Sequence, residues 1–194
     1  MKAIKKKINI FLGFVFVRIE KIKNKMVNSY QTFIFHKQIE NIGSKCHFNG
    51  QMKITGHSNI QMENNVHIGD GAYIRGEGGV YIGDNVHISR NLVLYSHNHN
   101  YEGEVLPYDN TFQFNKVTIE KNVWIGMNVV ILPGSYIGEG AIIGAGSVVY
   151  GNVPKLAIVG SAGYKILKYR DSDHYNELEQ NKKYGGIDGR PINS

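Results

Sequence analysis

The chain has few of the residues that mark several common protein classes. It has a single cysteine, Cys46, in 194 residues, so no disulfide can form within the chain, and such usage is typical of a reducing compartment. The longest apolar run, Ile10 to Val17, is far too short to span a bilayer, and charged residues follow it where a signal peptide would have small ones. Neither a phosphate-binding glycine loop between a strand and a helix nor a serine nucleophile elbow is present. The sequence therefore predicts neither a spanning helix nor covalent catalysis.

Positive charge is concentrated at one end of the chain. Residues 1–25 contain eight Lys or Arg residues and one Glu, whereas the other 169 residues contain 14 basic and 15 acidic residues. A nearly neutral body offers no basic face to nucleic acid, so we expect no nucleic-acid partner.

The basic end also carries apolar residues at helical spacing, which predicts a basic amphipathic helix in an N-terminal segment, residues 1–41. These apolar residues are Ile4, Ile8, Phe11, Leu12, Val15, Ile19 and Ile22. Such a helix can lie on the inner face of a membrane, which would make the protein cytoplasmic and peripheral. Alternatively, the helix packs on the rest of the chain or on a neighbouring subunit.

Residues 42–154 repeat in sixes, which fits neither a plain helix nor a plain strand. Five successive hexads open on Ile119, Ile125, Ile131, Ile137 and Ile143, and each has a small or aliphatic residue four places later. Upstream, the same frame holds at Met62, Ile68, Ile74, Ile82, Ile88 and Leu94. A six-residue period predicts an all-β fold, a parallel β-helix of about five coils with these side chains inward. Cys46 falls at a small, buried position of an early hexad.

The six-residue spacing is interrupted by extra residues three times, and each interruption falls on the third side of its coil. Eight residues separate Ile54 from Met62 and Ile74 from Ile82, and 25 separate Leu94 from Ile119. Two bulges and one long loop, residues 95–116, are therefore expected to stack on one edge. A loop that is not needed to build the coils is where function is usually found. Residues 155–194 form a C-terminal segment with a short helix near residues 173–183 and a polar tail.

The long loop contains the best candidate for proton transfer. It includes His97 and His99, and a histidine is the side chain best suited to remove a proton near neutral pH. The His-x-His spacing could also hold a metal, but no third ligand stands at a recognisable distance, so no metal is expected. Glycines at 76–79 and 144–146 are interpreted as tight corners with positive φ.

Three segments together resemble the hexapeptide-repeat acyltransferases. They are SHNHN (96–100), VWIGMNVVILPG (123–134) and IIGAGSVV (142–149). Within that family the chain is most similar to galactoside and maltose acetyltransferases and to bacterial O-acetyltransferases of capsule and O-antigen sugars. The resemblance implies a left-handed coil and a homotrimer with active sites between adjacent subunits. It implies acetyl-CoA as co-substrate and a saccharide hydroxyl of a surface polysaccharide, or of its precursor, as acceptor.

The resemblance also implies roles for individual residues. His97 would be the general base, with Asn98, His99 and Tyr101 beside the acceptor. Acetyl-CoA would be bound by residues of the two glycine-containing segments and by two lysines beyond the last coil. These are Trp124, Gly126, Met127, Gly144, Ala145, Lys165 and Lys168.

Two alternatives remain at this stage. An amine acceptor also needs a base, so N-acetylation of an amino sugar fits the same residues. A zinc-binding β-helix resembling the γ-class carbonic anhydrases would instead need three histidines across a subunit interface.

Overall fold

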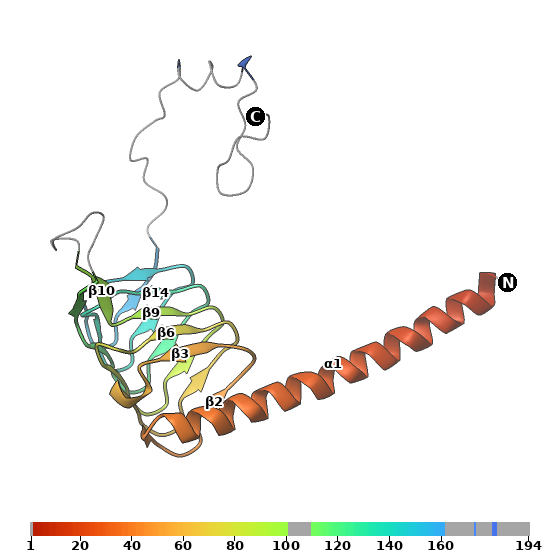
Figure 1. Ribbon diagram of the computed structural model, residues 1–194, viewed down its shortest axis with the longest axis horizontal. Helices are drawn as coiled ribbons and strands as arrows, with labels where there is room; N and C mark the ends of the chain where they lie inside the picture. Colours follow the sequence, from red (N-terminus) through yellow and green to blue (C-terminus); the bar gives the residue numbers. More distant parts are fainter. Residues whose placement is uncertain (1, 101–109, 162–172, 174–179, 182–194) are drawn as a thin grey trace. The chain divides into compact units, whose positions relative to one another are not determined.

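The computed structural model describes residues 2–100, 110–161, 173 and 180–181, and the chain divides into two units, Met1–Ser161 and Ala162–Ser194. The first unit is a parallel β-helix preceded by one helix, α1 (Lys2–Gln38) (Figure 1). Lys165 and Lys168 and most of the predicted helix at 173–183 lie outside the described residues.

Three parallel sheets form the sides of the β-helix, with one short strand of each coil in each sheet. Sheet A consists of β1 (Asn41–Ile42), β4 (Ile60–Met62), β7 (Val80–Ile82), β12 (Val117–Ile119), β15 (Tyr136–Ile137) and β18 (Asn152–Val153). Sheet B consists of β2 (His47–Phe48), β5 (His67–Ile68), β8 (His87–Ile88), β13 (Trp124–Ile125), β16 (Ile142–Ile143) and β19 (Ile158–Val159). Sheet C consists of β3 (Lys53–Thr55), β6 (Tyr73–Arg75), β9 (Val93–Tyr95), β14 (Val130–Ile131) and β17 (Val148–Val149). The described chain thus makes five full coils and the first two sides of a sixth.

The predicted inward residues form the core. Each is at most 4% exposed: Ile68, Ile74, Ile82, Ile88, Ile119, Ile125, Ile131, Ile137 and Ile143. Successive coils place them in register, as where Ile125 lies between Ile88 and Ile143 in sheet B. In each of the five successive hexads that begin at Ile119, the residue four places after the start is buried as well, including Ser135 and Ser147. Cys46 is 1% exposed, and burial raises the pKa of its thiol. The hexad prediction is confirmed.

The two ends of the coil stack differ from the sequence-based boundaries. Residues 152–159 continue the repeat as β18 and β19, past the boundary expected at residue 154. At the other end, Phe35 and Ile39 are buried and Phe35 packs on Phe48, with ring centroids 4.9 Å apart. The end of α1 thereby covers the apolar core of the first coil.

Tight turns between the sheets need a left-handed backbone, and asparagine often supplies it. Asn91 and Asn128 have φ of 59° and 56°, and the Asn91 side-chain amide donates to Asn128 Oδ1 at 2.9 Å. Of the glycines expected to have positive φ, Gly79 and Gly146 do. Gly76, Gly78 and Gly144 do not, so the interpretation was wrong for these three. Gly78 is required instead because a Cβ there would overlap the carbonyl oxygen of Ser96.

Candidate active site

The three insertions stack on one edge, as the interruptions of the six-residue spacing predicted. This edge, the turn from sheet C to sheet A, is called here the C–A corner. The backbone of Gly56 in the first bulge lies against Gly76 and Glu77 of the second, and Asn59 Nδ2 donates to the Glu77 carbonyl at 2.8 Å. The Gly78 N–H donates to Ser96 Oγ at 2.8 Å, which joins the second bulge to the long loop.

His97 lies at the base of the long loop, in a hairpin at the C–A corner. Strand β10 (His97–His99) pairs antiparallel with β11 (Phe112–Phe114), and His97 faces Phe114 in the register. The ring centroid of His97 is 5.3 Å from that of Phe112 and 5.9 Å from that of Phe114. His97 is 5% exposed, whereas Asn98 and His99 are exposed. Tyr101 lies outside the described residues.

Ser96 fixes the backbone next to His97. Its side chain is fully buried, and its hydroxyl donates to the Arg75 carbonyl at 2.8 Å while accepting the Gly78 N–H. Its own carbonyl accepts the Asn115 N–H at 2.8 Å. Ser96 therefore joins the second bulge to both ends of the long loop.

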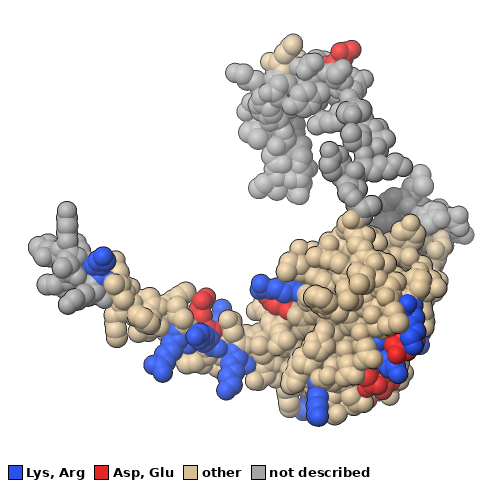
Figure 2. Space-filling model, turned by 180° about the vertical axis from the view of Figure 1, so that it is seen from behind, with Lys and Arg blue, Asp and Glu red and all other residues tan. Residues whose placement is uncertain are grey.

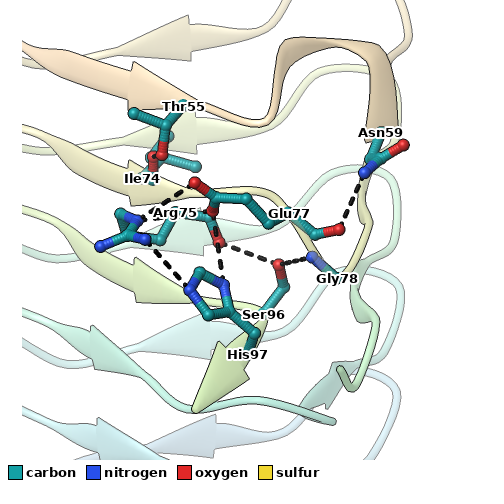
Figure 3. Close-up of polar contacts among 8 residues, drawn as sticks. All are labelled: Thr55, Asn59, Ile74, Arg75, Glu77, Gly78, Ser96 and His97. Atoms are coloured by element: carbon teal, nitrogen blue, oxygen red, sulfur yellow. Dashed lines mark hydrogen bonds and ion pairs between the residues drawn. The ribbon is translucent and has the colours of Figure 1, made fainter. Parts of the chain in front are cut away.

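The imidazole of His97 lies between a cation and an anion supplied by the second bulge (Figure 3). Arg75 Nη2 lies 3.1 Å from His97 Nε2, and because guanidinium only donates, Nε2 accepts. His97 Nδ1 lies 3.4 Å from Glu77 Oε2. This contact falls short of hydrogen-bond geometry, and Nδ1 is buried without another partner. With Nε2 accepting, the proton of the neutral ring is assigned to Nδ1, facing the carboxylate.

The surroundings of His97, burial above all, favour its neutral form. Burial lowers the pKa of His97 below its ordinary value, and Arg75 and His99 act in the same direction, while Glu77 opposes them. Burial raises the pKa of Glu77, but hydrogen bonds from its own N–H and from Thr55, together with the Arg75 charge, lower the pKa overall. The site thus holds a neutral histidine beside an ionised carboxylate near neutral pH.

Arg75, Glu77 and Ser96 were not predicted as site residues. The available signal was the eight-residue spacing from Ile74 to Ile82, which marks Arg75 and Glu77 as part of an insertion. Their proximity to His97 depends on coil stacking, which places Arg75 beside Tyr95.

The residues expected to bind acetyl-CoA lie on a different edge, the turn from sheet B to sheet C, called here the B–C corner. A Cβ on Gly126 would lie 2.7 Å from Ala145 N, so two coils meet there backbone to backbone. The Gly146 N–H donates to the Met127 carbonyl at 2.8 Å. Trp124 and Met127 are 56% and 50% exposed beside this contact. The structure thus brings together all the described residues of this set: Trp124, Gly126, Met127, Gly144 and Ala145. They lie at the B–C corner, whereas His97 of the same chain lies at the C–A corner.

Within the described residues, no group of three His, Cys, Asp or Glu side chains could hold a metal ion. The histidines on the outer face of sheet B form a stack instead. The rings of His47, His67 and His87 follow one another at 5.0 and 4.4 Å.

Two family descriptions match the coils. The bacterial transferase hexapeptide (six repeats) matches residues 116–151, and the hexapeptide repeat of succinyl-transferase matches residues 60–96. Residues 60–96 and 116–151 are thus similar to the hexapeptide repeats of bacterial transferases. Both matched segments lie within the β-helix, one on each side of the histidine loop.

Similar proteins carry transferase names. The putative lipopolysaccharide biosynthesis O-acetyl transferase WbbJ of Escherichia coli is 31% identical over 117 residues, 56% of this chain and 60% of WbbJ. Galactoside O-acetyltransferase of the same organism is 35% identical over 120 residues, 57% of this chain and 59% of that protein. The chain thus matches about three fifths of the length of these relatives.

Among solved structures, the N-acyltransferase AntD of Bacillus cereus, with dTDP-4-amino-4,6-dideoxyglucose and coenzyme A bound, shares the fold. Its TM-score is 0.56 at 19% identity, over 79% of this chain and 95% of AntD.

Proposed function

We propose that this protein is an acetyl-CoA-dependent O-acetyltransferase that acts on a sugar hydroxyl of a surface polysaccharide or of its precursor. The proposal rests on the surroundings of His97, a buried and neutral histidine between Arg75 and Glu77. In the part of the chain that the structure describes, the insertions stack only at this C–A corner. The names of the two relatives support acetyl transfer to a saccharide oxygen.

His97 would act through Nε2. The proton on Nδ1 faces Glu77, so Nε2 carries the lone pair that a base needs. In the structure Arg75 Nη2 occupies that lone pair at 3.1 Å, and an acceptor hydroxyl would take its place. As Nε2 removes the hydroxyl proton, the oxygen attacks the thioester carbonyl. The new C–O bond forms, the C–S bond breaks, and the imidazolium returns its proton to the coenzyme A thiolate.

The B–C corner would hold the thioester and the pantetheine arm. Glycine at 126 lets the two coils meet backbone to backbone, since a Cβ there would lie 2.7 Å from Ala145 N. The segments of Met127 and Ala145 therefore lie side by side at this corner. The N–H groups of Met127 and Ala145 would donate to acetyl-CoA, one of them to the oxyanion that develops during attack. Trp124, half exposed beside them, would form a wall of the pantetheine slot.

The two corners would form one site only between copies of the chain. Because His97 and Met127 belong to different edges of one β-helix, the proposed arrangement is a homotrimer in which the B–C corner of one subunit faces the C–A corner of the next. The exposed Asn98, His99 and Phe114 would then line the acceptor side. Aromatic faces and polar groups in this combination suit a sugar ring.

The direct test is an acceptor screen that follows thiol release from acetyl-CoA. The purified protein is mixed with oligosaccharides from capsule and O-antigen, with simple galactosides and with amino sugars, and the product is then treated with mild base. An acetyl ester is cleaved under these conditions, whereas an amide survives. We expect turnover with a polysaccharide fragment and a base-labile product. A base-stable product from amino sugars alone would replace this proposal with N-acetylation, and no turnover with stoichiometric zinc in the protein would point to a metalloprotein.

A further inference from the structure

Most of helix α1 exposes apolar side chains that the β-helix does not cover. The helix contacts the coils through its last part, where Phe35 is buried and Asn28 accepts the Gly50 N–H at 2.7 Å. The exposed apolar residues are 39–72% accessible: Ile10, Phe11, Leu12, Phe14, Val15, Phe16, Val17, Ile19, Ile22, Met26, Tyr30 and Phe33. An apolar surface of this extent marks an interaction site.

The arrangement of these residues distinguishes between possible occupants. Val15, Ile19, Ile22 and Met26 follow a spacing of three and four residues and form one stripe along the helix. Between Ile10 and Val17, however, every residue is apolar or glycine, so the apolar surface surrounds the helix. A partner helix would cover one stripe and leave Phe14 and Val17 in water. The acyl region of a bilayer can cover several sides at once.

The charge on α1 favours the same occupant. The helix contains nine Lys or Arg residues and one acid, Glu20. Arg18, Lys21, Lys23 and Lys25 follow the apolar segment directly, and blue side chains are prominent along the helix in Figure 2. Copies of such a helix placed side by side would repel one another, whereas an anionic surface attracts each of them.

We propose that α1 lies in the interface of a bilayer that contains anionic phospholipid. Residues 10–17 would insert below the headgroups, and the four basic residues that follow would bind the phosphates. No helix in the described part of the chain is long and apolar enough to cross a membrane, which is consistent with a helix lying in the plane of the surface. This inference does not depend on the proposed activity, because its readout is lipid binding.

The experiment measures co-sedimentation of the full chain with vesicles of phosphatidylcholine containing about a third phosphatidylglycerol. One variant replaces Arg18, Lys21, Lys23 and Lys25 by Gln. Its matched control replaces four exposed lysines of the β-helix by Gln: Lys45, Lys53, Lys116 and Lys121. We expect the helix variant to bind about 600-fold more weakly, since each of the four basic residues near an anionic surface contributes about fivefold, and the control to bind within about twofold of the unaltered protein.

A second variant tests the apolar contribution. Replacing Phe11, Val15 and Ile19 by Ser should lower vesicle affinity at least tenfold at both low and high salt, because salt screens charge but not apolar insertion. Size-exclusion chromatography of the same variant should give the oligomer of the unaltered protein. The proposal would be overturned if the helix variant and its β-helix control lost binding equally, or if the unaltered protein did not bind anionic vesicles. An apolar variant that binds normally, or one whose oligomer dissociates without lipid present, would also overturn it.

Discussion

The C–A and B–C corners belong to the same coils, yet they are built in different ways. At the B–C corner the chain turns within a hexad, and Asn128 or Gly146 provides the left-handed residue. At the C–A corner three insertions add side chains, and Arg75, Glu77 and His97 gather there with buried Ser96. The regular corner thus presents backbone, whereas the interrupted corner presents polar and charged side chains. The proposed acyl transfer would use both.

Filling the B–C corner should have the largest effect on stability. Gly126→Val would force a side chain against Ala145 N at 2.7 Å and Ile143 O at 3.0 Å, and neither backbone atom can move without separating two coils. We expect a loss of about 3 kcal/mol in the free energy of unfolding by urea. Gly151→Ala at the C–A corner is the control, because its φ is 69° and no atom lies within 4 Å of the added Cβ. That change should cost about 1 kcal/mol, and equal losses in the two variants would show that the B–C corner is not tightly packed.

Removing either charge at the C–A corner should shift the pH dependence of kcat/KM. The shifts should have opposite signs for Arg75 and Glu77. In the proposed mechanism neutral His97 is the base, so kcat/KM should fall as the pH falls through the lowered pKa of His97. Glu77 raises that pKa, so Glu77→Gln should move the acidic limb to lower pH. Arg75 lowers it, so Arg75→Gln should move the limb to higher pH. A pH–rate profile with shifts of the same sign in both variants would contradict the arrangement.

The smallest effect is expected from the asparagine at the B–C corner. Asn128→Ala places an alanine at a φ of 56° and removes the hydrogen bond from Asn91. The cost should be about 1–2 kcal/mol. Asn128→Gly loses the same hydrogen bond without the left-handed penalty and should cost less. Thermal unfolding of both variants separates the cost of the left-handed backbone from the cost of the lost hydrogen bond. A glycine variant less stable than the alanine variant would refute the claim that alanine is strained at this φ.

The difference between the corners also explains what the sequence could predict. Isoleucine every six residues places Ile125 and Ile143 in the core, because the period alone sets which side chains point inward. His97 and His99 could be proposed because they fall in a loop that the coils do not need, and the family resemblance implied the choice of His97. Its partners could not, since Arg75 and Glu77 are 22 and 20 residues away and reach it only through the stacking of one coil on the next. Nor could the burial of His97 be predicted, because it depends on the pairing of β10 with β11.

The most direct test of the account is the rate of acetyl transfer from acetyl-CoA to the acceptor found in the screen, compared between His97→Ala and His47→Ala. His47 is an exposed histidine on sheet B and serves as the matched control. The account predicts that His97→Ala lowers kcat by roughly 100-fold or more, that its dissociation constant for acetyl-CoA stays within about threefold, and that His47→Ala behaves like the unaltered protein. Near-normal turnover of His97→Ala would contradict the central claim that His97 is the base.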